Sequence, residues 1–170
     1  LSAIPLFMLM GGFAVHGGLP KALFDFANSL LGRFKGGMAM AGILACAAFG
    51  AISGSTVATT ATIAQVAYPE MRRIAYSGRL ATAALATGGT MGVLLPPSVT
   101  LMVYAILTEQ NITKTFLAAY VPAILAALGY LVVIAIYVRL HPGHAPEARA
   151  ASGAEVAQAA AGVWPIALIF

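Results

Sequence analysis

Apolar residues along the chain form long uninterrupted blocks, separated by short polar segments that carry the charges. Three blocks, residues 36–69, 80–108 and 116–138, contain no charged residue at all. About twenty apolar residues are enough for a helix to cross a membrane. The pattern therefore predicts an all-α integral membrane protein. A hydrophobic share of 61% against a charged share of 8% agrees with this, because soluble domains carry far more charge.

Shorter segments flank these blocks. Residues 1–15 are apolar but too short to cross alone, so we expect the end of a span there. Residues 19–34 place apolar residues at helical spacing beside polar ones, which predicts an amphipathic interfacial helix, with packing on another protein surface as the alternative. Residues 142–162 are rich in Ala, Gly and Glu and predict an exposed linker, and residues 163–170 predict the start of a truncated further span.

The block 36–69 is too long for one simple crossing. Basic pairs stand at both of its ends, Arg33/Lys35 before it and Arg72/Arg73 after it, and basic residues favour the cytoplasmic side. Its centre consists of glycine, serine and threonine between two apolar arms. These features predict a re-entrant helical hairpin. Its tip should face a site, because non-helical backbone at membrane depth is tolerated only next to protein or a watery cavity.

The block 80–108 predicts a membrane helix that is broken near its middle. Its centre carries Gly88, Gly89 and Gly92 and then the pair Pro96-Pro97. The prolines remove two amide donors and clash with the preceding turn, while glycine accepts unusual backbone angles. Residues 116–138 then predict an ordinary crossing that returns the chain to the basic side.

The two interrupted segments are the candidates for chemistry, because they offer hydroxyl and free carbonyl oxygens. Such neutral oxygens at half-helix ends can hold a hard monovalent cation within a membrane. The alternative is that these small residues only allow close helix packing, as in Gly50-x-x-x-Gly54 or Gly88-x-x-x-Gly92. Two independent breaks in one short chain favour a shared site. The candidate cation-binding residues are Ser53, Gly54, Ser55, Thr56, Gly88, Gly89, Thr90, Gly92 and Pro96.

Several function classes are disfavoured by what these blocks lack. Asp, Glu, Lys, Arg and His are missing from all three, which favours sodium coupling over a proton relay. Nothing resembles a paired nucleophile and base, so we expect no enzyme and no organic cofactor. His141 and His144 lack supporting ligands at metal spacing, so we expect no metal other than sodium. Loop charges explain the net charge of +4 without a nucleic-acid partner.

Four motifs in order resemble the large, DctM-like membrane subunit of TRAP transporters. The likeness runs from about Ile4 to Pro142. The motifs are the stretch from Ser53 to Ile63, the sequence Tyr68-Pro-Glu-Met71, the stretch from Gly88 to Ser98 and the sequence Thr108-Glu-Gln110.

The resemblance implies an elevator-type transporter of the bacterial inner membrane, multi-pass, built from two inverted repeats that each contain a re-entrant hairpin and a broken helix. This chain resembles the first repeat. The resemblance places a sodium site on the candidate residues above and a substrate beside them, which we expect to contact Thr59, Pro97 and Ser98. It also implies a small membrane subunit and a periplasmic binding protein as partners, with carboxylates such as C4-dicarboxylates, keto acids or sialic acid as substrates.

Two other functions remain open from the residues alone. A re-entrant hairpin can form the selectivity filter of an ion channel. A structural membrane scaffold would use the small residues only to pack helices. The channel would conduct without a delivering protein, and the scaffold would show no ion dependence.

Overall fold

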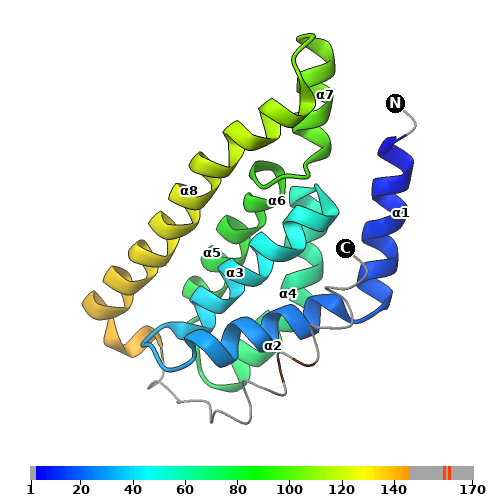
Figure 1. The fold of residues 1–170 in the computed structure, drawn as a ribbon. Helices are drawn as coiled ribbons and strands as arrows, with labels where there is room; N and C mark the ends of the chain where they lie inside the picture. Colours follow the sequence, from blue (N-terminus) through cyan, green and yellow to red (C-terminus); the bar gives the residue numbers. More distant parts are fainter. Residues whose placement is uncertain (1–2, 146–158, 160, 162–170) are drawn as a thin grey trace.

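The structure is a computed structural model that describes residues 3–145, 159 and 161, and residues 3–145 are built from helices joined by short turns (Figure 1). The predicted linker beyond Ala145, apart from residues 159 and 161, and the predicted span at 163–170 lie outside the described residues. The helices are α1 (Ala3–His16), α2 (Leu19–Leu31), α3 (Gly37–Ser53), α4 (Thr56–Arg73), α5 (Gly78–Gly89), α6 (Met91–Leu94), α7 (Val99–Leu107), α8 (Ile112–Leu140) and the 3₁₀ turn η1 (Pro142–His144).

Helices α3 and α4 form a hairpin with a two-residue turn, whose tip reaches the level of α6 (Figure 1). Gly54 ends α3 in the left-handed region, with φ of 60°, and its N–H donates to the Gly50 carbonyl at 2.8 Å. Ser55 begins α4, because its side chain accepts a hydrogen bond from the Ala58 N–H. Glycine fits the left-handed turn without a steric cost, so this short connection needs Gly54.

Helices α5, α6 and α7 run in sequence through the second interrupted block. Helix α5 ends at Gly89 and α6 ends at Leu94, and the following Pro96 and Pro97 supply no amide donor. Ser98 starts α7 by accepting a hydrogen bond from the Leu101 N–H. The stretch Gly78–Leu107 is long and apolar enough to cross a membrane, judged by length and composition.

Helix α8 is the longest helix and the most apolar candidate for a crossing, with a mean hydropathy of 2.5. It begins at Ile112, earlier than the predicted 116, because the Asn111 side chain caps it by accepting from the Lys114 N–H at 3.1 Å. Much of its apolar surface is exposed, for example at Val121, Leu125 and Val133. Lipid or protein must cover this face in a membrane.

Helix α3 forms the centre of the core. Ala41, Ile43, Cys46 and Phe49 have no exposed surface, and α3 packs against α2, α4, α5 and α8. Alanine and glycine make up much of the helix, and small side chains let neighbouring helices approach closely. The hairpin arm α3 is therefore enclosed by protein.

Helix α2 lies across the base of the hairpin (Figure 1). Its apolar residues Leu19, Phe24 and Ala27 are buried, while Lys21 and Asp25 form an exposed ion pair of 2.9 Å. Part of the amphipathic helix's apolar face therefore contacts the hairpin rather than a membrane. The helix ends at Leu31, before the predicted 34, because the chain turns through residues 32–36 to reach α3.

Candidate functional site

The hairpin tip and the broken helix meet, and glycines at the contact let the two backbones touch. A Cβ added to Gly50 of α3 would lie 2.5 Å from the Cα of Gly92 in α6. A Cβ added to Gly92 would lie 2.8 Å from Thr59 Oγ1 and 3.0 Å from the Ser55 carbonyl oxygen, both from the tip and α4. Any side chain at these two positions would push the hairpin away from the break.

Two further contacts join the same segments. A Cβ on Gly89, the last residue of α5, would overlap Thr60 Oγ1 of α4. A Cβ on Gly54 at the turn would lie 3.1 Å from the Val99 nitrogen and 3.8 Å from the Pro97 carbonyl oxygen. The hairpin turn therefore lies directly against the residues that begin α7.

Four half-helix ends come together at this contact. Helices α3 and α6 end near here, and the last carbonyl oxygens of a helix have no partner within that helix. Helices α4 and α7 begin here, at Ser55 and Ser98, so their partly positive amino ends face the same region. The arrangement offers oxygen ligands to a cation and positive helix ends to an anion.

Hydroxyl groups of the hairpin form a small hydrogen-bonded set at the tip. Ser53 Oγ and Thr59 Oγ1 are 2.6 Å apart, and Thr59 has no exposed surface. Thr60 Oγ1 donates to the Thr56 carbonyl at 2.8 Å. The buried side-chain polar atoms of the described residues all have hydrogen-bond partners. The tip is therefore ordered by its own hydroxyls.

The sequence candidates do not all lie at this contact. The structure brings together Ser53, Gly54, Ser55, Thr56, Thr59, Gly89, Gly92 and Pro97, with the Thr56 carbonyl oxygen 3.4 Å from a Cβ added to Gly89.

Other candidates face elsewhere or are hidden. Gly88 packs on α3, where an added Cβ would lie 3.1 Å from Cys46 Sγ. The Thr90 hydroxyl lies 3.3 Å from Tyr130 Oη of α8, on the side away from the hairpin. Pro96 and Ser98 are buried next to the break.

Gly50 and Thr60 belong to the contact but are not among the site residues predicted from the sequence. Gly50 stands four residues before Gly54, and that spacing indicates only a packing motif. Thr60 stands four residues after Thr56, which places both on one face of α4. Their partners Gly92 and Gly89 lie on another helix, so the sequence holds no direct signal for the pairing.

Comparison with known proteins places the chain in a family. The sequence profile of the "Tripartite ATP-independent periplasmic transporter, DctM component" family matches residues 1–170. The chain belongs to this DctM family. TRAP large permeases are membrane-embedded transporters rather than enzymes, and the two long apolar stretches of this chain agree with that. The family match confirms the resemblance drawn from the motifs.

Individual relatives are large permease proteins. The chain is 42% identical to the C4-dicarboxylate TRAP transporter large permease protein DctM of Pseudomonas aeruginosa over 140 residues, covering 82% of this chain and 33% of the relative. It is 38% identical to the protein of the same name from Vibrio cholerae, covering 81% of this chain and 30% of the relative. It is 32% identical to the sialic acid TRAP transporter permease protein SiaT of Haemophilus influenzae, covering 77% of this chain and 21% of the relative. The chain thus spans about a third of the length of these relatives or less.

Proposed function

We propose that this chain is one repeat of the large permease subunit of a sodium-coupled TRAP transporter, which carries small organic acids across the bacterial inner membrane. The hairpin of α3 and α4 enters the membrane and returns to the same side, and the other repeat, with inverted topology, completes the elevator-type transporter. The observation that carries the proposal is the backbone contact between Gly50, in the last turn of α3, and Gly92 of the short helix α6.

The sodium site in this proposal lies where carbonyl and hydroxyl oxygens of the tip approach the break. Ser53 and Ser55 from the tip, with the backbone at Gly89 and Gly92, supply neutral oxygens and no net charge. Carbonyls at half-helix ends are a recurring coordination for coupling ions in secondary transporters. Residues 80–108 contain no Asp, Glu, Lys, Arg or His, which supports sodium rather than a proton as the coupled ion.

The organic acid in this proposal binds beside the ion, at the amino ends of α4 and α7. The helix dipole, and the first-turn amides that the capping side chains of Ser55 and Ser98 do not reach, favour a carboxylate there. Thr59 and Ser98 have no exposed surface in this structure. Contact between these hydroxyls and substrate therefore requires the hairpin tip to move away from α7.

Substrate class and partners follow from the family. Relatives are named for transport of C4-dicarboxylate, isethionate and sialic acid, all organic anions. We propose that a small membrane subunit and a periplasmic binding protein work with the complete permease, as the tripartite description of the family implies. Delivery by a binding protein also separates this function from an ion channel, which would conduct without one.

The test is uptake of a radiolabelled carboxylate into liposomes that hold the full-length parent and its small subunit, with the binding protein added outside. Initial rates are measured against sodium concentration for the wild type and for Ser53→Ala. We expect uptake to need a sodium gradient, and Ser53→Ala to raise the half-saturating sodium concentration about tenfold, since a hydrogen bond to a charged group contributes about 1.5–3 kcal/mol.

Ser29→Ala is the matched control, because it removes a hydroxyl that donates to the Phe26 carbonyl in α2, away from the tip. It should leave the sodium dependence unchanged. Wild-type uptake at a rate that does not depend on sodium would contradict the proposed sodium coupling. Sodium-dependent uptake with an unchanged half-saturating sodium concentration in Ser53→Ala would show that the ion does not bind at the hairpin tip.

A further inference from the structure

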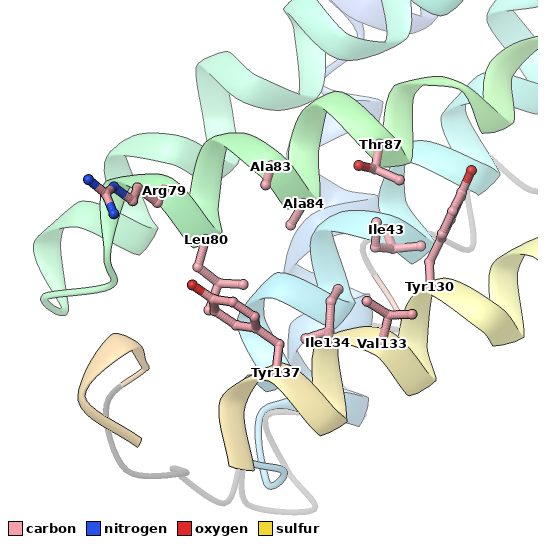
Figure 2. A pocket seen from close by; sticks show the side chains of 10 residues that line it. All are labelled: Ile43, Arg79, Leu80, Ala83, Ala84, Thr87, Tyr130, Val133, Ile134 and Tyr137. Atoms are coloured by element: carbon pink, nitrogen blue, oxygen red, sulfur yellow. The ribbon is translucent and has the colours of Figure 1, made fainter. Parts of the chain in front are cut away.

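A groove lies between α5 and α8, on the side of the molecule away from the hairpin tip. Its volume is about 290 Å³, and Figure 2 shows the side chains that line it. The walls are almost entirely apolar: Leu80, Ala83 and Ala84 come from α5, Val133 and Ile134 from α8, and Ile43 of α3 forms the floor.

The groove exists because small residues face large ones. Tyr130 and Tyr137 of α8 stand two turns apart and bracket the groove at its two ends (Figure 2). Between them α5 presents Ala83 and Ala84, which are too small to fill the space that the tyrosines keep open. Ala83 and Val133 are exposed, so the groove opens onto the outer surface.

The two ends of the groove differ in charge. Arg79 lies at the end where α5 begins and α8 finishes, with its guanidinium directed outward from the groove, whereas Thr87 and Tyr130 lie at the other end (Figure 2). The acids Asp25 and Glu70 pair with Lys21 and Arg73, and among the described residues no carboxylate lies within ion-pair distance of Arg79.

The Arg79 end also carries other positive groups. Helix α5 begins beside it, and Arg139 lies in the last turn of α8. The Tyr137 hydroxyl lies 2.9 Å from His144 Nδ1, and the Ser77 N–H donates to the His144 carbonyl at 3.0 Å, so η1 ties the start of α5 to the end of α8. A negatively charged headgroup here would face a cation and a helix amino end.

We propose that the α5–α8 groove binds an anionic phospholipid, with its phosphate at Arg79 and an acyl chain along Ala83, Ala84 and Val133 toward Tyr130. The wall chemistry matches a hydrocarbon chain, and the basic end matches an anionic headgroup. Basic pockets between membrane helices bind such headgroups, and a long arginine side chain can reach the headgroup level from the helix end. An empty apolar groove would forfeit the dispersion contacts of its lining, so filling it stabilises the α5–α8 pair.

The lipid site is independent of the proposed sodium site. Helix α5 contributes to both sites, but none of the residues that line the groove is among the proposed ligands of the ion, Ser53, Ser55, Gly89 and Gly92. Retained lipid can therefore be measured without any uptake assay.

The experiment uses the full-length parent with its small subunit, reconstituted in vesicles of equal parts phosphatidylglycerol and phosphatidylcholine with the same acyl chains. After gentle extraction, native mass spectrometry counts the retained lipids. We expect the wild type to retain phosphatidylglycerol over phosphatidylcholine. Arg79→Gln should lower the retained phosphatidylglycerol about fivefold, as for one basic side chain near a membrane surface. Ala83→Phe fills the groove and should remove the bound lipid of either headgroup.

Arg73→Gln is the matched control, because it removes an exposed arginine that ends α4 and does not line the groove. It should leave retention unchanged. Equal retention of the two lipids in the wild type, or a loss in Arg73→Gln as large as in Arg79→Gln, would overturn the headgroup assignment. Retention that neither Arg79→Gln nor Ala83→Phe changes would overturn the site, and would mean that another segment of the complete protein covers the groove.

Discussion

Gly50 of α3 and Gly92 of α6 are in backbone contact, since a Cβ on Gly50 would lie 2.5 Å from the Gly92 Cα and 2.8 Å from its nitrogen. This contact holds the last turn of α3 against the short helix α6. Only glycine on both sides permits so close an approach, and neither backbone can yield without moving its helix. The proposed ion site therefore depends on two positions that contribute no side chain.

We expect Gly50→Ala to lower the free energy of unfolding of the parent by about 1–3 kcal/mol, because the added methyl group forces the hairpin and the break apart. Thermal unfolding in detergent measures it. Gly129→Ala in α8 is the control, since an added Cβ there meets nothing within 4 Å. It should leave stability unchanged or raise it by up to about 1 kcal/mol through helix propensity. A Gly50→Ala protein as stable as the control would contradict the close contact.

We expect Thr59→Val to lower the free energy of unfolding by about 1–3 kcal/mol. The substitution keeps the side-chain shape and removes a fully buried hydroxyl that lies 2.6 Å from Ser53 Oγ. Sodium-dependent uptake should fall with it, since Ser53 loses its partner at the tip. Chemical denaturation and uptake are the measurements. Thr82→Val removes an exposed hydroxyl bonded to the Gly78 carbonyl, and its effect should stay within about 0.5 kcal/mol. Equal effects of the two substitutions would show that the Thr59 hydroxyl contributes no more to stability and uptake than an exposed hydroxyl does.

We expect Tyr76→Phe to loosen the start of α3. The Met38 N–H, at the second position of that helix, donates to the Tyr76 hydroxyl at 3.3 Å, and the Tyr76 ring is almost fully buried. Loss of such a cap costs about 0.5–2 kcal/mol. Hydrogen exchange at the Met38 amide should become faster, whereas Tyr104→Phe, which makes the same change on an exposed ring, should not affect it. Unchanged exchange of the Met38 amide in Tyr76→Phe would show that the Tyr76 hydroxyl does not stabilise the start of α3.

The same tyrosine predicts a pH dependence. Burial raises the pKa of Tyr76 above its usual value of 10.0. A group whose pKa is raised by folding contributes stability below its unfolded pKa, and that contribution is lost as pH rises through the folded pKa. Stability of the wild type should therefore fall more steeply above about pH 10 than that of Tyr76→Phe, in denaturation measured from pH 8 to 11. Parallel curves would show that Tyr76 does not ionise differently on unfolding.

The positions of the helix breaks were readable from local sequence. Gly54 accepts the left-handed backbone of a tight turn and the Pro96-Pro97 pair lacks amide donors, so both interruptions fall within the predicted segments. Boundaries set by caps were less readable. Helix α8 begins after the Asn111 cap and not at the predicted residue 116. Charge and hydropathy do not show where a side chain replaces a backbone hydrogen-bond partner, so they missed this boundary.

Side-chain direction within the candidate site was not readable from the motifs. Gly88 and Thr90 belong to the same motif as Gly89 and Gly92, yet Gly88 packs on α3 and Thr90 lies against Tyr130 of α8. Successive residues of a helix point about 100° apart, so a contiguous motif serves several neighbours at once. The rotation of the helix among those neighbours decides which residues reach the hairpin.

The sequence by itself determined the membrane class, the two breaks and the family, because charge-free blocks, proline and glycine act locally and motif order is a property of the chain. Only the tertiary structure decided that Gly50 meets Gly92, that Thr60 lies against Gly89, and that α5 and α8 leave a groove beside Arg79. These outcomes depend on how helices distant in sequence pack together. Packing is set by the shapes of many side chains jointly, so no single motif contains it.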